Sequence, residues 1–405
     1  MNESIPFPGQ SYLEHINKTL WSGKPYGRAA VMIGAGFSRT AEPTKVNAKQ
    51  FPNWKQLAGM MYEELHPSAG PPNVEREKKK NSAISGLGAI KVASEYESWF
   101  GREKLDNLLL TSIPYDSYRP GKLHERLLSL PWSDIFTTNY DTLLEHTRPL
   151  VHDRDYELVL TARDIPRSKK PRVAKLHGSF PSNRPFIVTE EDYRTYPVKF
   201  AAFVNLVQQS LMENTFCLIG FSGDDPNFLN WLGWVRENLK EHTPLMYLCG
   251  VLNLSGSESK LLESRNVIPI DLSPIVPEEG YPDSGQRNAE ALAWLLNQLK
   301  LGEPPNILNW PRLALPSSVK DGDSNTRSWT TVVEETDNPE LISPPQRVYG
   351  EELKQQMKVW KKQRLTYPGW LVCPGKNRDV LWMYTCRWIF AVSYTHLTLP
   401  TNREV

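Results

Sequence analysis

The chain has 405 residues, a length that allows two or three domains. It carries 47 Lys and Arg against 46 Asp and Glu, so its formal net charge of +1 argues against dependence on phosphate-backbone contacts. With 40% hydrophobic and 23% charged residues, the composition excludes an intrinsically disordered chain.

Cysteine usage and the lack of targeting signals indicate the compartment. No two of the four cysteines lie two to four residues apart, so the spacing of a zinc ribbon is missing. Cys217 and Cys249 lie in apolar runs, which is typical of buried thiols in a reducing compartment. No secretory signal is visible at the start, and no apolar stretch approaches the ~20 residues of a membrane span. We expect a cytoplasmic protein that needs no zinc and no membrane.

Short apolar runs alternate with helical patterns over the first three hundred residues. Runs that are apolar throughout are typical of strands buried on both faces. The predicted strands are 29–33, 134–138, 172–176, 215–219, 245–248 and 267–270. The predicted helices are 53–65, 198–213, 225–239 and 287–299. This alternation predicts an α/β fold, a Rossmann-like doubly wound parallel sheet, over residues 1–300.

Other segments depart from this alternation. Residues 67–85 are rich in Pro, Gly, Ser and Lys and indicate a solvated loop, and 88–130 look helical, so a helical insertion that acts as a lid is expected over about 67–130. Residues 301–347 indicate a linker. Residues 348–391 indicate the start of an incomplete helical second domain, so the chain is expected to be truncated. Residues 392–405 are typical of translated sequencing-adapter text and are excluded from fold reasoning.

Two glycines follow the first predicted strand directly, in the run Gly34, Ala35, Gly36, Phe37 and Ser38. Glycines at such a turn let the backbone approach a pyrophosphate, whose oxygens accept hydrogen bonds from free amides. A tight turn between strand and helix explains them equally well, because the third glycine of the dinucleotide fingerprint is missing.

Polar residues also follow the second and third predicted strands. Thr138, Asn139 and Asp141 follow one strand, where an amide and a carboxylate two residues apart can face one cavity. Asp141 can equally cap the next helix. His177 follows the other strand and can act as a general base near neutral pH, although a lone histidine is more often structural.

A fourth polar motif, Gly220, Phe221 and Ser222, follows the strand at 215–219. Glycine and serine there suit a contact with a phosphate or a ribose. Asp225 comes just before a proline, which is typical of a helix N-cap.

The four motifs occur in the order found in the sirtuins, the NAD-consuming Rossmann-like family. This resemblance covers residues 29–300, and segments 51–54 and 220–228 are similar to the bacterial sirtuin-like domains of anti-phage defence proteins. The chain lacks the two Cys-x-x-Cys pairs and the GIPDFR-type stretch of protein-deacylating sirtuins. The resemblance therefore implies an NAD+ hydrolase that acts in abortive infection, with NAD as substrate.

The resemblance also implies roles for individual residues. Asn139 and His177 are the expected catalytic residues: Asn139 positions a water or the ribose at the anomeric carbon, and His177 contacts the ribose and accepts a proton. Asp141 is expected to hold the nicotinamide carboxamide. The other expected NAD contacts are Gly34, Ala35, Gly36, Ser38, Thr138, Gly220, Phe221 and Ser222.

Two other functions stay open on the sequence. One is a non-catalytic sensor that binds NAD or ADP-ribose, and the other is an NAD-dependent protein deacylase. The resemblance further implies a homo-oligomer, activated through the missing C-terminal region by a trigger such as a phage component or a nucleic acid.

Overall fold

A central parallel sheet organises the part of the chain that the structure describes. The computed structural model describes residues 7–67, 74–152, 154–221, 223 and 225–303. The predictions for the linker, the second domain and the tail lie outside the described residues, as does Ser222.

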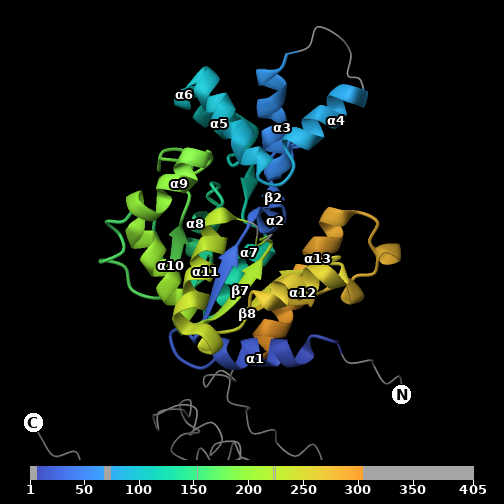
Figure 1. The fold of residues 1–405 in the computed structure, drawn as a ribbon. Helices are drawn as coiled ribbons and strands as arrows, with labels where there is room; N and C mark the ends of the chain where they lie inside the picture. Colours follow the sequence, from blue (N-terminus) through green and yellow to red (C-terminus); the bar gives the residue numbers. More distant parts are fainter. Residues whose placement is uncertain (1–6, 68–73, 153, 222, 224, 304–405) are drawn as a thin grey trace, which may run out of the picture. The chain divides into compact units, whose positions relative to one another are not determined.

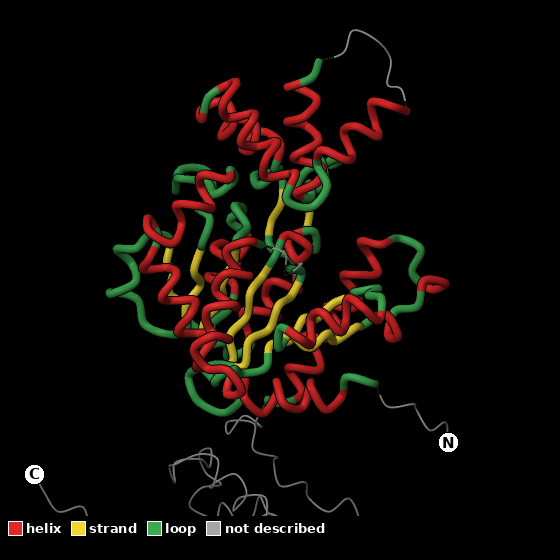
Figure 2. The backbone as a smooth tube through the Cα atoms, in the orientation of Figure 1, coloured by secondary structure: helices red, strands yellow, loops and turns green. Residues whose placement is uncertain are grey.

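Seven strands form this sheet, in the order β5-β6-β4-β1-β7-β8-β9, and all neighbouring strands are parallel (Figure 2). The strands are β1 (Ala29–Ile33), β4 (Asp134–Thr137), β5 (Glu157–Val159), β6 (Arg172–Lys175), β7 (Thr215–Ile219), β8 (Met246–Gly250) and β9 (Val267–Asp271). The predicted α/β, doubly wound fold is confirmed. The sequence predicts six of these strands and misses β5, a three-residue edge strand.

Helices cover both faces of the sheet (Figure 1). Alternate residues of β1 enter different cores: Val31 and Ile33 pack on one face, and Ala30 and Met32 on the other. The first face is covered by α1 (Gln10–Leu20), α7 (Lys122–Ser129) and α13 (Ser284–Leu301). The second face is covered by α9 (Glu190–Lys199), α10 (Ala201–Glu213) and α11 (Pro226–Leu239). Burial on both faces explains why β1 is apolar throughout.

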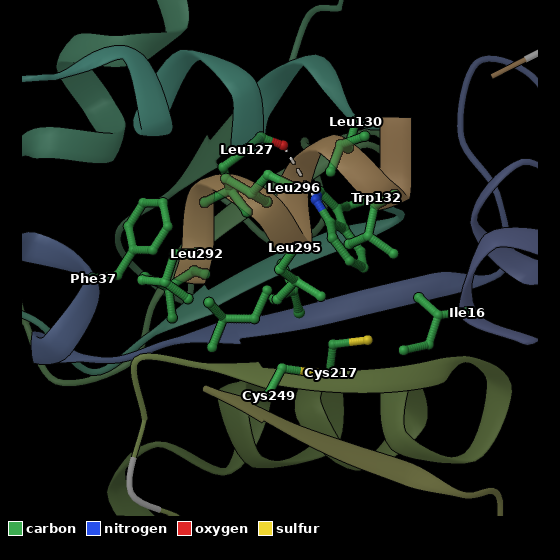
Figure 3. Packing of buried hydrophobic residues seen from close by; sticks show 14 of the residues in the cluster. Ile16, Phe37, Leu127, Leu130, Trp132, Cys217, Cys249, Leu292, Leu295 and Leu296 are labelled. Carbon is green, nitrogen blue, oxygen red and sulfur yellow. Dashed lines mark hydrogen bonds between the residues drawn. The ribbon is translucent and has the colours of Figure 1, made fainter. Parts of the chain in front are cut away.

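The core under α13 is shown in Figure 3. Leu292, Leu295 and Leu296 of this helix pack with Trp132, whose indole nitrogen donates to the carbonyl of Leu127 at 3.1 Å. The thiols of Cys217 and Cys249 belong to the same core and are free, in agreement with the sequence prediction. Burial raises the pKa of both thiols.

A helical layer stands beyond the carboxyl ends of the strands, at the top of Figure 1. It consists of α3 (Trp54–Leu65), α4 (Val74–Ala83), α5 (Gly88–Phe100) and α6 (Arg102–Ser112). Its own core includes Met61 and Tyr96 and also takes in Phe186 and Val188 from the segment after β6. The predicted insertion also included α7, but this helix packs on the first face of the sheet, with α1 and α13.

The prediction of a solvated loop at residues 67–85 is wrong for 74–83, which form α4. Oppositely charged residues one turn apart support this helix, because Lys79 lies 2.8 Å from Glu75. Glu63 of α3 adds a second anchor, at 3.0 Å from Arg76 and 2.9 Å from Lys80.

The remaining short elements connect these layers. They are α2 (Ala35–Ser38), β2 (Glu42–Pro43), β3 (Tyr118–Arg119), α8 (Leu143–Thr147) and α12 (Gly256–Ser264). Among the helices described, none is long and apolar enough to cross a lipid bilayer.

The ends of β1 and β7 approach each other through glycine. The amide of Gly34 donates to the carbonyl of Ile219 at 3.1 Å, and that of Gly36 donates to Gly220 at 2.9 Å. A Cβ on Gly34 would lie 2.3 Å from the carbonyl oxygen of Gly220, and Gly220 itself has a φ of +61°. Glycine is therefore required at both positions by the packing of the backbone.

The variant Gly34→Ala is expected to lower the free energy of unfolding by about 1–3 kcal/mol, because the new methyl group overpacks against a backbone oxygen. The control is Gly233→Ala in α11, where a Cβ meets nothing within 4 Å. That control is expected to raise the free energy of unfolding by up to about 1 kcal/mol. Urea unfolding followed by circular dichroism measures both changes, and equal stability of the two variants would contradict the close approach.

Candidate functional site

The direction in which the chain adds strands to the sheet reverses between β1 and β7. The chain builds β4, β5 and β6 on one side of β1 and then returns to place β7, β8 and β9 on the other. Ligands of doubly wound sheets bind beyond the carboxyl ends of the strands at such a reversal. The four predicted motifs follow β1, β4, β6 and β7, so all of them lie at this edge (Figure 1).

The turn after β1 divides its residues between solvent and interior. Ala35 is exposed and Gly36 is half-buried, whereas Ser38 is buried. The turn between β1 and α2 therefore exposes the backbone at Ala35 and directs the hydroxyl of Ser38 into the interior. Both readings of the glycines, a tight turn and a backbone that can approach a ligand, are compatible with this arrangement.

A chain of hydrogen bonds joins Ser38, Asn139 and Asp141. The side-chain amide nitrogen of Asn139 donates to Ser38 Oγ at 2.9 Å, and Ser38 Oγ donates to Asp141 Oδ2 at 2.7 Å. The other oxygen of Asp141 accepts from the amide of Leu143 at 3.2 Å. Asp141 therefore accepts from the first residue of α8, in line with the alternative that it caps this helix. Its second oxygen accepts from Ser38. Thr138, beside this cluster, is half-buried.

Lys175, at the end of β6, is a buried cation that the sequence reasoning missed. Its side chain is 2% exposed, it donates to the backbone carbonyl of Asp141, and it lies 3.3 Å from Glu145. Glu145 also accepts from the hydroxyl of Ser179 at 2.7 Å. Because a buried ammonium is costly unless it is paired, this lysine ties the loop after β4 to the loop after β6. A lysine inside an apolar strand was the available signal.

His177 lies in a buried site of its own. The residue is 2% exposed, and its Nε2 lies 3.3 Å from the side-chain amide nitrogen of Asn227 and 4.0 Å from Asp225 Oδ2. The rings of Tyr193 and Tyr196 meet it edge-on, at centroid distances of 5.6 and 5.7 Å. Burial lowers the pKa of His177, and the negative charges of Asp225 and Asp192 oppose that effect. The imidazole is therefore neutral at pH 7.

The two predicted catalytic residues thus belong to neighbouring clusters. Asn139 bonds with Ser38, and His177 contacts Asn227 and Asp225. The strands that carry them are adjacent, and the amide of Leu176 donates to the carbonyl of Thr137 at 2.9 Å.

The turn after β7 completes the edge. Gly220 packs on the turn after β1, and the side chain of Phe221 is buried against Phe228 with ring centroids 5.4 Å apart. Asp225 caps α11, as the sequence predicts, by accepting from the amide of Phe228 at 3.0 Å.

His124 is a second buried histidine, for which the sequence offered no context. It is 1% exposed, its Nδ1 accepts from the amide of Gly121 at 3.3 Å, and its ring meets Phe37 edge-on at 4.9 Å. Burial lowers its pKa to about 4, against the opposing charges of Asp141 and Glu42. The neutral imidazole of His124 therefore packs against Phe37, which follows the glycine turn after β1. Over the described ranges, no group of three or more His, Cys, Asp and Glu side chains could hold a metal ion.

Comparison with known families identifies this edge of the sheet. Residues 133–270 match the model of the SIR2-like domain, and they include Asn139, Asp141, His177 and Gly220. This stretch of the chain is similar to a SIR2-like domain. The resemblance to sirtuin-like domains inferred from the motifs is confirmed by this match.

Curated relatives of this SIR2-like domain carry names from NAD chemistry and defence. The chain is 29% identical over 223 residues to "NAD(+) hydrolase ThsA" of Acinetobacter baumannii (strain 532279), covering 53% of this chain and 41% of that protein. It is 22% identical over 261 residues to "Defense-associated sirtuin 2" of Bacillus subtilis, covering 63% of this chain and 24% of that protein. The chain therefore spans less than half the length of these relatives.

Solved structures are only weakly similar to this chain. A crystal structure of a SIR2 homologue in complex with NAD matches with a TM-score of 0.34 and 13% sequence identity. The match covers 71% of this chain and 94% of that one.

The variant Lys175→Met is expected to lower the free energy of unfolding by about 3–5 kcal/mol, because it leaves the largely buried carboxylate of Glu145 without its cation. Adding Glu145→Leu to it is expected to recover part of this loss. The control Lys79→Met removes a closer but exposed pair, 2.8 Å apart, and is expected to leave the stability almost unchanged, because water screens that pair. Chemical denaturation measures all three, and similar losses for the two single variants would refute the pairing.

Proposed function

We propose that this chain is an NAD+ hydrolase that cleaves the bond between nicotinamide and ribose. The observation that carries the proposal is the hydrogen-bonded cluster of Ser38, Asn139 and Asp141, placed beside His177 at the switch point of a SIR2-like sheet. Relatives named NAD(+) hydrolase support the reaction, and one named defence-associated sirtuin supports a role in defence, which we propose is abortive infection against phage.

In this proposal the pyrophosphate lies on the two glycine turns. Gly34 and Gly220 approach so closely that no side chain fits between them, and the backbone is exposed at Ala35, where it can come close to anionic oxygens. The residues that we assign to NAD contacts are Gly34, Ala35, Gly36, Ser38, Thr138, Gly220, Phe221 and Ser222.

Bond cleavage needs orientation more than a strong nucleophile. Asp141 holds the carboxamide of nicotinamide, and Asn139 places a water at the anomeric carbon. Departure of nicotinamide leaves an oxocarbenium-like centre, which the water attacks while neutral His177 takes its proton. NAD+ and water thus give nicotinamide, ADP-ribose and one proton, which His177 passes to solvent.

Access to His177 requires movement. The ring is 2% exposed under Tyr193 and Tyr196 of α9, so a ribose can reach it only when this helix shifts. Arg102 of the helical layer bonds Asp192 of α9 at 2.9 Å and also donates to the carbonyl of Phe186. We therefore assign a gating role to the helical layer.

Regulation follows from this closed arrangement. We propose that activity is released by homo-oligomer assembly or by a trigger, such as a phage component or a nucleic acid, that acts through chain beyond residue 303. The buried free thiols Cys217 and Cys249 favour a reducing compartment, the cytoplasm.

The second candidate is a sensor that binds NAD or ADP-ribose without turnover. The observation that favours it is the enclosure of His177, which keeps the proposed base away from any ligand in this conformation. Tight binding of NAD by calorimetry, with no product from the assembled and triggered protein, would favour the sensor.

The hydrolase is tested by incubating the chain with NAD and quantifying nicotinamide and ADP-ribose by chromatography. Asn139→Ala and His177→Ala are each expected to lower the rate at least about 100-fold, the usual contribution of a positioned acid–base group. The control His242→Ala removes an exposed histidine and is expected to leave the rate unchanged. Full activity in both Asn139→Ala and His177→Ala would eliminate the assigned roles.

A further inference from the structure

Asp225 uses only one of its carboxylate oxygens to cap α11. Oδ1 accepts from the amide of Phe228 at 3.0 Å, which satisfies the first turn of the helix. Oδ2 is directed elsewhere: it accepts from the hydroxyl of Tyr193 at 3.2 Å and lies 4.0 Å from His177 Nε2. Capping alone therefore does not account for this carboxylate.

The interaction between Asp225 and His177 is shielded from water. The side chains are 12% and 3% exposed, so solvent and salt screen their interaction weakly. Tyr193, which bonds the carboxylate, also meets the imidazole ring edge-on, and α9 and α11 lie side by side (Figure 1). One tyrosine thus holds the carboxylate in place beside the ring.

Asn227 completes the surroundings of Nε2. It is 1% exposed, and its amide nitrogen lies 3.3 Å from that ring nitrogen. A side-chain amide can present a donor or, when it turns over, an acceptor. Asn227 can therefore satisfy Nε2 both when this nitrogen is bare and when it carries a proton.

Other groups face His177 from α9 and cannot replace Asp225. Tyr193 and Tyr196 are neutral, since burial raises the pKa of both hydroxyls. Asp192 is negative, but it pairs with Arg102 at 2.9 Å, which compensates its charge. Asp225 is left as the carboxylate whose charge acts on the ring.

We propose that Asp225 is a positioning residue for His177, whose imidazolium form it stabilises with Oδ2 while Tyr193 and Asn227 hold the two groups in register. The proposal rests on the proposed function, in which His177 takes a proton from the attacking water. The O–H bond of the water breaks, an N–H bond forms on the ring, and positive charge appears beside the carboxylate. The proton leaves to solvent after nicotinamide and ADP-ribose are released.

The test measures the protonation of His177 directly in the full chain without ligand. Protein labelled with ¹³C and ¹⁵N in histidine is titrated by NMR, and His177→Gln assigns the signal. Asp225→Asn keeps a good N-cap and removes the charge, so the pKa of His177 is expected to fall by about one unit or more. Asp225→Ser, also a good cap, provides a second uncharged variant, and circular dichroism verifies that each is folded.

The matched control is Asp283→Asn, which changes an exposed aspartate that caps α13 in the same way, at 2.7 Å from the amide of Gln286. It is expected to leave the titration of His177 where it is in the wild type. A midpoint in Asp225→Asn or Asp225→Ser within 0.3 unit of the wild type would overturn the proposal. A wild-type ring that stays neutral down to acid unfolding would overturn it as well, because Asp225 would then give the imidazolium no support.

NAD cleavage supplies a second readout. The acid limb of kcat/KM is expected to move to lower pH in Asp225→Asn by the same amount as the NMR midpoint. A shifted NMR midpoint in a protein that never cleaves NAD would refute the hydrolase and leave the coupling of Asp225 to His177 standing. Cleavage with no shift in either measurement would refute the coupling alone.

Discussion

The contact between the turns after β1 and β7 is the constraint on which the site depends. Gly34 and Gly220 meet backbone to backbone, and this meeting fixes where the two halves of the sheet separate. Because α2 starts at once after Gly34, Ser38 comes to face the loop after β4, where it bonds Asn139 and Asp141. A side chain at either glycine would move the turn and, with it, every polar group of this cluster. The placement of chemistry at this edge is therefore a consequence of backbone packing.

Burial of charge is the second organising feature. Lys175 and the carboxylates of Asp141 and Glu145 lie together under the loops, and each has a partner of opposite charge or a hydrogen-bond donor. Such groups add little net stability, because desolvation offsets much of their attraction. Their benefit is geometric, since a buried ion pair tolerates few alternative positions. The loops after β4 and β6 are thus held rigidly although neither is regular secondary structure.

The sequence predicts the framework better than the site. Short, mostly apolar runs locate six strands because burial on both faces leaves a clear pattern, whereas β5 has three residues at an edge and shows none. The many charged residues of 74–83 are typical of a solvated loop. The ion pair between Lys79 and Glu75 forms only when the segment is helical, so the sequence did not reveal it. The sequence predicts Asp225 as a cap, but a cap needs only one carboxylate oxygen, and nothing in the sequence places the second oxygen beside Tyr193 and His177. Contacts such as Asn227 with His177 join residues 50 positions apart and need the fold to be seen.

The same contacts that prepare His177 also close its site. Tyr193 orients the carboxylate beside the ring and covers the ring, so one residue contributes to both properties. Asp192, one position before it, is held by Arg102 of the helical layer, which connects the cover to the layer above the strands. A signal that separates Arg102 from Asp192 would release α9 from the helical layer. Opening would then expose the ring and, because burial is what lowers the pKa of His177, make it a stronger base, which couples access to reactivity through a single ion pair.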